Sequence, residues 1–244
     1  MGKSILTRQL KRRFQALGAR WLDACLPSTC LLCGAPGATE PLCPACAAEL
    51  PALPAPHCPL CLNPTPYGER CGACLQQPPR FDHVIALYAY AFPVDRLVHQ
   101  LKYAARFSLA RHWGMALAAR LDSLGTPVSR VMPVPLHHER LAERGYNQSL
   151  EIARRLASTL DLRLDYQNLV KTHATRPQAE LPLAARQRNL QDAFACLADL
   201  EGEHVLLVDD VLTSGATLDA AARVLKQHGA RAVSVCVVAR TLRH

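Results

Sequence analysis

The stretch VLLVDDVLTSGATLDAA, residues 205–221, is the most informative part of this sequence of 244 residues. Its four leading apolar residues are typical of a buried strand in a parallel sheet, and they end at Asp209 and Asp210. The run TSGAT, residues 213–217, then leads into a helical pattern. We therefore predict a strand, a short turn and a helix, which together form one unit of an α/β sheet.

The TSGAT turn has the composition of a phosphate-binding turn. Small residues let the backbone approach a ligand closely, and amides at a helix start can surround a phosphate, with hydroxyl groups as further donors. The predicted phosphate ligands are Thr213, Ser214, Gly215, Ala216 and Thr217. The carboxylates of Asp209 and Asp210 suit the hydroxyls of a sugar whose 5-phosphate occupies the turn. An ordinary capped strand-to-helix turn is the simpler alternative, and the lack of a Walker lysine disfavours a nucleoside triphosphatase.

Strand and helix patterns alternate from residue 81 onward. Strands are expected at 83–91, 130–136, 162–166, 205–208 and 232–239, and helices at 95–103, 108–124, 148–160 and 218–228. The stretch between residues 171 and 191 is long and polar. Alternation of this kind predicts a parallel sheet flanked by helices, whose ligands bind beyond the carboxyl ends of the strands.

The cysteines of the first third form an internal duplication. Eight of the eleven cysteines build two copies of the pattern C-x2-C-x9-C-x2-C, offset by 28 residues. The predicted metal ligands are Cys30, Cys33, Cys43 and Cys46 in the first copy, and Cys58, Cys61, Cys71 and Cys74 in the second. Four thiolates suit a structural zinc ion, which would replace the missing hydrophobic core of such a segment. We therefore expect two structural zinc ions in a small cysteine-rich domain.

Three alternatives to two separate zinc sites remain open at this stage. An iron–sulfur cluster also accepts four thiolates, and the two copies could exchange their CxxC pairs. Disulfides require an oxidising compartment, which the sequence does not suggest. Cys25 and His57 lie beside a ligand set that is already complete, and Cys196 and Cys236 lie in apolar surroundings typical of buried thiols.

The first residues are basic and follow a helical pattern. Residues 1–23 carry six Lys or Arg against one Asp, within a formal net charge of +8 for the whole chain, and their apolar residues recur at helical spacing. We predict a basic amphipathic helix at 1–24, a double zinc ribbon at 25–80 and the sheet domain at 81–244. No apolar run is long enough to span a bilayer and no secretory signal is evident, so a cytoplasmic location is expected.

The residues from about Cys25 to Arg240 resemble the ComF/GntX family of competence-associated, phosphoribosyltransferase-like proteins. The two acids followed by TSGAT match the family's fingerprint for phosphoribosyl pyrophosphate (PRPP). The other matching segments are CLLCG, LCPAC, LKY (101–103), PVPLHHERLAERGYNQS (133–149), and the residues Thr175, Gln178, Leu181, Arg186 and Asn189. The resemblance implies a type I phosphoribosyltransferase-like fold that binds PRPP or ribose 5-phosphate with magnesium. It also implies a function in DNA uptake during natural transformation.

The resemblance also implies roles for individual residues. Arg140, Arg144 and Asn147 lie in the expected pyrophosphate loop, although Arg140 and Arg144 at i, i+4 also fit an ordinary basic helix face. Lys171 and Arg186 lie in the expected mobile flap, 171–191. The predicted catalytic set is Asp209, Asp210, Arg144 and Arg186. His137 and His138 are weaker candidates, because no carboxylate at metal spacing is evident beside them.

Two functions remain open. The first is a phosphoribosyltransferase, a pentosyl glycosyltransferase that joins ribose 5-phosphate to an acceptor which the sequence does not identify. The second is a non-catalytic module on the same fold that senses a metabolite or binds single-stranded DNA or the DNA-uptake machinery, because fold alone does not decide activity.

Overall fold

The computed structural model describes residues 29–125, 127–172 and 193–242. The chain divides into two compact units, with the boundary between Glu49 and Leu50. The predicted helix at 1–24 and most of the predicted flap, including Arg186, lie outside the described residues. The predicted domain boundaries at residues 24 and 80 remain predictions.

After residue 80, described helices lie between β1 and β2, between β2 and β3, and between β6 and β7, which agrees with the predicted alternation at these places, whereas β3, β4, β5 and β6 follow one another with no described helix between them. The helices are α2 (Pro44–Ala48), α3 (Gly72–Gln76), α4 (Val94–Tyr103), α5 (Phe107–Ser123), α6 (His138–Arg144), α7 (Gln148–Leu160) and α9 (Ala216–Gln227). The strands are β1 (His83–Ala89), β2 (Arg130–Pro133), β3 (Arg163–Leu164), β4 (Leu169–Lys171), β5 (Phe194–Cys196), β6 (His204–Leu212) and β7 (Ala232–Arg240). None of the described helices combines the length and apolar character needed to cross a bilayer.

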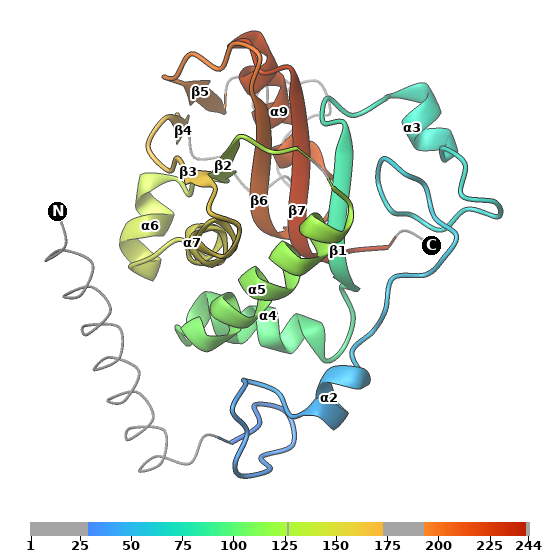
Figure 1. The fold of residues 1–244 in the computed structure, drawn as a ribbon, viewed down its shortest axis with the longest axis vertical. Helices are drawn as coiled ribbons and strands as arrows, with labels where there is room; N and C mark the ends of the chain where they lie inside the picture. The colour runs from blue at the N-terminus through green and yellow to red at the C-terminus, as the bar shows by residue number, and fades with distance from the viewer. Residues whose placement is uncertain (1–28, 126, 173–192, 243–244) are drawn as a thin grey trace, which may run out of the picture. The chain divides into compact units, whose positions relative to one another are not determined.

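Five strands form the central sheet, in the order β1-β7-β6-β2-β3 (Figure 1). Every pair of neighbours is parallel, which confirms the predicted parallel sheet. Strand β6 lies near the middle and is apolar over its first five residues except for His204. Such strands are buried on both faces, because helices cover both sides of a parallel sheet.

The two faces of the sheet are covered by different helices. Alternate residues of a strand point to opposite faces, and Val205 and Leu207 belong to the core cluster that also contains Leu218 and Leu225 of α9. Helices α5 and α7 pack together on the other face, opposite α9 in Figure 1. Gly114 of α5 permits this packing, because a Cβ there would lie 2.7 Å from the Cβ of Arg155.

The structure corrects three sequence predictions. Residues 138–144 form helix α6 where a polar loop was expected. Strands β4 and β5 form a separate antiparallel pair on either side of the expected flap. Strand β6 continues to Leu212, so Asp209 and Asp210 lie within the strand and not after it, because parallel pairing with β7 extends as far as Leu212 and Arg240.

Candidate functional site

The two adjacent acids of β6 are held by residues from two other elements of the sheet domain, helices α4 and α7. The Asp209 Oδ1 atom accepts hydrogen bonds from the Ser149 hydroxyl at 2.7 Å and from the Asp210 amide at 2.9 Å. The Lys102 Nζ atom lies 2.9 Å from Asp210 Oδ2, and the Asp210 side chain is 6% exposed. Helix α4, helix α7 and strand β6 therefore converge on these two carboxylates.

Burial and a neighbouring carboxylate change the protonation of Asp209. Burial, and then the negative charge of Asp210, raises the pKa of Asp209 to about 7. The Ser149 hydroxyl, the Asp210 amide and the Lys102 charge oppose this shift by stabilising the carboxylate. Asp209 therefore changes charge near neutral pH, where an ordinary aspartate is fully ionised.

The TSGAT turn follows directly from the carboxyl end of β6. Gly215 has φ +86° and precedes the first residue of α9, and this left-handed conformation favours glycine. Thr213 and Ser214 are exposed, and the Ser214 hydroxyl oxygen accepts a bond from the Ala216 amide at 3.4 Å. Thr217 lies in the first turn of α9. The five predicted phosphate ligands thus form one continuous turn at a helix start, which is an arrangement that suits an anion.

Helix α6 carries the two arginines of the expected pyrophosphate loop, so their i, i+4 spacing does place them on a helix. Arg140 is exposed. The Arg144 Nη1 atom donates to the Gln148 Oε1 atom at 2.5 Å, and its guanidinium carbon lies 5.2 Å from the centre of the Tyr103 ring. Because Tyr103 follows Lys102, Arg144 lies beside the segment that contacts Asp210.

Lys171 ends strand β4 and is electrostatically coupled to both halves of the site. Burial lowers the pKa of Lys171, and the charge of Arg140 lowers it further, while the charge of Asp209 opposes both effects. Lys171 therefore lies close enough to Arg140 and Asp209 for each to influence its protonation.

Asn147 has a structural contact for each of its amide atoms. Its Oδ1 atom accepts from the Ser149 and Leu150 amides, which caps α7, and its Nδ2 atom donates to the Val134 carbonyl at 3.0 Å. The cap also orients Ser149, whose hydroxyl binds Asp209. The expected role of Asn147 in pyrophosphate binding remains a prediction.

The histidine pair has a carboxylate neighbour that the sequence analysis did not anticipate. The His137 Nδ1 atom lies 3.5 Å from Glu139 Oε2, and the two histidine rings are 4.0 Å apart. His137 is buried, whereas His138 and Glu139 are exposed. The predicted absence of a carboxylate at metal spacing was therefore wrong, because the start of α6 turns Glu139 back toward His137.

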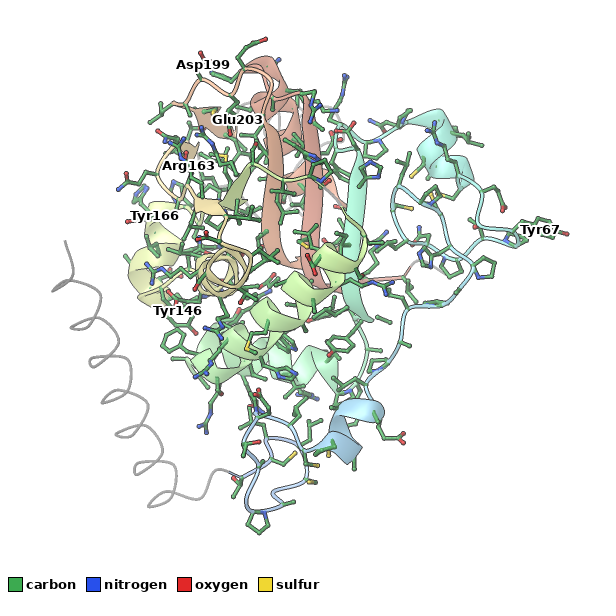
Figure 2. The ribbon with its side chains drawn as sticks, viewed as in Figure 1. Tyr67, Tyr146, Arg163, Tyr166, Asp199 and Glu203 are labelled. Carbon is green, nitrogen blue, oxygen red and sulfur yellow. The ribbon has the colours of Figure 1, made fainter. Side chains whose placement is uncertain are left out.

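Aromatic side chains surround the Arg144 side of the site. The Tyr103 side chain is 67% exposed and Phe107 is 45% exposed. Tyr146 contacts the Phe107 ring edge-on at 4.8 Å, and its hydroxyl donates to the Leu101 carbonyl. Glu203 directly precedes β6 and therefore lies at the amino end of that strand. In Figure 2, Tyr146 lies far from Glu203.

Each cysteine repeat closes its own cluster, so the two copies do not exchange ligands. The four sulfurs of each copy lie within 4.8 Å of one another. The Sγ atoms of Cys33 and Cys43 are 3.8 Å apart, and those of Cys61 and Cys71 are 3.5 Å apart. Tetrahedral zinc with Zn–S bonds of about 2.3 Å requires S···S distances of about 3.8 Å. None of the ten described cysteines forms a disulfide, and both clusters fit zinc.

The thiols within each cluster differ in acidity. Backbone hydrogen bonds lower the pKa of Cys30 to about 6. Burial opposes ionisation of Cys58, but backbone amides outweigh burial and lower its pKa to about 7. Sulfur neighbours raise the pKa of Cys46 to about 12. Four adjacent thiolates therefore require a cation, whereas one thiolate per cluster forms readily. Cys196 and Cys236 are buried and belong to neither cluster, as predicted.

Lys102 and Ser149 are site residues for which the sequence predicted no role. Lys102 belongs to the LKY segment and Ser149 ends the stretch 133–149, and both segments match the ComF/GntX pattern. The pattern could have pointed to them, but their contacts with Asp210 and Asp209 depend on the sheet order.

Two family models match the chain. The Phosphoribosyl transferase domain matches residues 147–243, and the Double zinc ribbon domain matches residues 21–75. The second model covers both cysteine repeats, and the first contains the acid pair and the TSGAT turn.

Several named proteins are similar over most of their length. The DNA utilization protein YhgH of Escherichia coli O6:H1 is 35% identical over 220 residues, covering 87% of this chain and 90% of that protein. Competence protein F of Haemophilus influenzae is 33% identical over 82% of this chain and 90% of that protein. Competence protein ComFC of Bacillus subtilis is 27% identical over 80% and 82%, respectively. A purine phosphoribosyltransferase structure from Pyrococcus horikoshii aligns with a TM-score of 0.35, 20% identity and coverage of 65% of this chain and 88% of that chain.

Proposed function

The chain belongs to the ComF family of competence and DNA utilization proteins, and on this premise we propose that its sheet domain binds PRPP or ribose 5-phosphate with magnesium. The observation that carries the proposal is the sequence of groups at the end of β6, where two carboxylates lead directly into the TSGAT turn. A sugar phosphate presents hydroxyls and a phosphate in the same order. The names of the relatives support a further proposal, that this binding serves DNA uptake. A cytoplasmic location stays part of the proposal.

Each part of the site has a separate chemical task. The turn amides and hydroxyls would bind the 5-phosphate, and Asp209 and Asp210 would accept hydrogen bonds from the ribose hydroxyls. Arg140, Arg144 and Lys171 would attract the pyrophosphate group, and Arg144 can do so with two parallel hydrogen bonds. The two carboxylates also supply the oxygen ligands that magnesium prefers, so the residues present fit that ion.

The proposed reaction is phosphoribosyl transfer. The bond between ribose C1 and the pyrophosphate oxygen breaks and pyrophosphate leaves with the electron pair. A nitrogen of the acceptor forms the new bond to C1 with its lone pair and releases its proton to water. Magnesium, when bound, neutralises the leaving pyrophosphate. Positive charge develops on the ribose, and the neighbouring carboxylates stabilise it. Positioning and electrostatics account for this mechanism, with Arg144 and Arg186 as the proposed groups on the leaving-group side.

A direct binding experiment tests the proposal. Calorimetry with ribose 5-phosphate or PRPP, each with magnesium, should give a single site on the wild-type protein. The double variant Asp209→Asn/Asp210→Asn should bind both ligands at least about tenfold more weakly, because two charge-assisted hydrogen bonds are lost. Far-UV circular dichroism confirms that the sheet is retained. Equal affinity in the two proteins would refute the site.

Product analysis separates an enzyme from a binding module. Wild-type protein incubated with PRPP, magnesium and a panel of bases or single-stranded DNA should release pyrophosphate with at least one acceptor. Normal ribose 5-phosphate binding without any pyrophosphate release would contradict the transferase and support a non-catalytic module.

One observation favours single-stranded DNA as the partner of such a module. Tyr103 is an exposed aromatic ring beside the Arg144 guanidinium, and Phe107 is a second exposed ring, in edge contact with Tyr146; bases stack on rings of this kind. Tyr103→Ala should weaken single-stranded DNA binding while ribose 5-phosphate affinity is retained. A matched Tyr67→Ala variant removes another exposed ring, one that lies in the second cysteine repeat. If both variants bind DNA like the wild type, this surface is not the DNA site.

A further inference from the structure

Arg240, the last residue of β7, joins two segments that lie far apart in the sequence. Its side chain is buried at 2% exposure. Its Nε atom donates to the Cys61 carbonyl at 2.6 Å, and Nη2 donates to Asn63 Oδ1 at 3.2 Å. Its Nη1 atom donates to the Leu212 carbonyl at 3.0 Å and to the Thr213 carbonyl. One guanidinium therefore connects the second cysteine cluster to the first residue of the TSGAT turn.

Leu62 reinforces this connection with an apolar contact. It lies between Cys61 and Asn63, is 5% exposed, and belongs to the same core cluster as Leu212 and Leu218. Its φ of +60° is unfavourable for leucine by about 1 kcal/mol. Packing in the core of the sheet domain retains this conformation. The loop that carries the second cysteine cluster therefore packs against that core through Leu62.

The segment after Cys74 is attached to the helix that follows the turn. The Arg80 amide donates to Asp219 Oδ1, in the first turn of α9, at 2.6 Å. The Asp82 carboxylate binds the Lys226 Nζ atom at 2.7 Å and the Val233 amide at 2.8 Å. The chain that forms the second cluster is therefore held against both ends of the TSGAT turn, before it through Arg240 and after it through Asp219.

We propose that the metal held by Cys58, Cys61, Cys71 and Cys74 keeps the TSGAT turn in its binding conformation, with Arg240 as the positioning residue between them. Cys61 is both a metal ligand and the acceptor for Arg240 Nε. Without the ion, the segment around Cys61 loses its cross-link, and the buried guanidinium loses fixed acceptors, which is costly for a charged group. The Thr213 carbonyl then loses its anchor. This inference rests on the proposed function, because it assigns the second zinc site to the phosphate-binding region.

Hydrogen exchange and ligand binding test the metal's role. The variant Cys61→Ser/Cys71→Ser removes two ligands of the second cluster, and Cys33→Ser/Cys43→Ser is the matched variant that keeps the second cluster. Relative to the matched variant, the second-cluster variant should show at least about tenfold faster amide exchange at 213–217 and at least about tenfold weaker ribose 5-phosphate binding. Equal exchange and equal affinity in the two variants would overturn the proposal.

Arg240→Lys tests the connection without removing a metal ligand. Arg130→Lys is the matched control, because Arg130 is 3% exposed and is bound to Asp165 and Glu203 at the amino end of the sheet. Both substitutions should lower stability, but only Arg240→Lys should speed exchange at 213–217 while zinc content stays at two. If amide exchange at 213–217 in Arg240→Lys is as slow as in the wild type, the proposal is overturned. This test remains valid even if the second-cluster variant does not fold. If wild-type protein binds no ribose 5-phosphate, the proposed function fails. Amide exchange at 213–217 in the variants then still tests whether the second cysteine cluster holds the TSGAT turn through Arg240.

Discussion

Lys102 Nζ lies 2.9 Å from Asp210 Oδ2 and pairs a cation of helix α4 with a buried carboxylate of strand β6. Asp210 is 4% exposed, whereas the Lys102 side chain is 25% exposed. The ion pair balances one of two adjacent negative charges, and it fixes the LKY segment beside the site. Tyr103 consequently lies under the Arg144 guanidinium.

Lys102→Met should destabilise the protein by about 1 to 3 kcal/mol, because Asp210 is left as a buried charge without this cation. Urea denaturation measures the change. Asp210→Asn removes the excess charge, so the double variant Lys102→Met/Asp210→Asn should recover part of the loss. Additive effects of the two single substitutions would show that the ion pair contributes no coupling energy.

Asp209 predicts a specific pH dependence of stability. Its pKa is raised to about 7 in the folded protein and is about 4 in an unfolded chain. Between these values the folded state keeps a proton that the unfolded state has lost, so this contribution to stability is present at low pH and is lost as pH rises through about 7. Asp209→Asn does not titrate, and its amide oxygen can still accept the bonds from Ser149 and the Asp210 amide.

The difference in unfolding free energy between Asp209→Asn and wild type should therefore rise with pH by about 3 to 4 kcal/mol between pH 4 and 8, because a shift of about three pKa units is worth about 1.4 kcal/mol per unit. Urea titrations at several pH values measure it. Lys102, Lys171 and Asp210 are present in both proteins, so their contributions to the pH dependence of the unfolding free energy cancel to first order in the difference. A difference that stays flat over this range would contradict the raised pKa.

The two cysteine clusters predict two zinc ions per chain. Elemental analysis of protein purified without chelators should give this ratio, and chelation should increase proteolysis within residues 29–76, because these segments contain little core of their own. Cys196→Ser alters a buried thiol outside both clusters and should leave the zinc ratio at two. Protein with free thiols and no metal would contradict the assignment, and iron in place of zinc would correct the identity of the ion.

Arg144→Ala and Arg186→Ala should lower turnover of PRPP much more than affinity for ribose 5-phosphate, because ribose 5-phosphate has no pyrophosphate to bind. A loss of at least about tenfold in kcat is expected for each, as for a charge-assisted contact made by the leaving group. Arg154→Ala is the matched control, since Arg154 is an exposed arginine of α7 that pairs with Glu151 on the same helix at 3.0 Å. Parallel losses of turnover and ribose 5-phosphate affinity would place these arginines outside the pyrophosphate region.

The sequence alone determined the features that depend on local order. Helix α7 has the predicted bounds, 148–160, because its apolar residues recur at helical spacing and Asn147 caps its first turn. Apolar runs predicted the parallel strands, and the CxxC spacing predicted both clusters, because a CxxC turn brings two sulfurs together without help from the rest of the chain. Asp209, Asp210 and TSGAT are contiguous, so their proximity also required no tertiary information.

Only the tertiary structure decided which distant residues complete these local units. Helix α6 has no buried residue, so its sequence carries no apolar stripe that would have predicted it. Strand β6 extends through the acids because β7 pairs with it to Leu212, which no local propensity for Asp would suggest. Lys102 reaches Asp210, and Arg240 joins Cys61 to Thr213, because the order β1-β7-β6-β2-β3 brings strand ends and helices together across long stretches of chain. Sequence spacing fixes neighbours along the chain, whereas strand order and the packing of buried side chains fix neighbours across it.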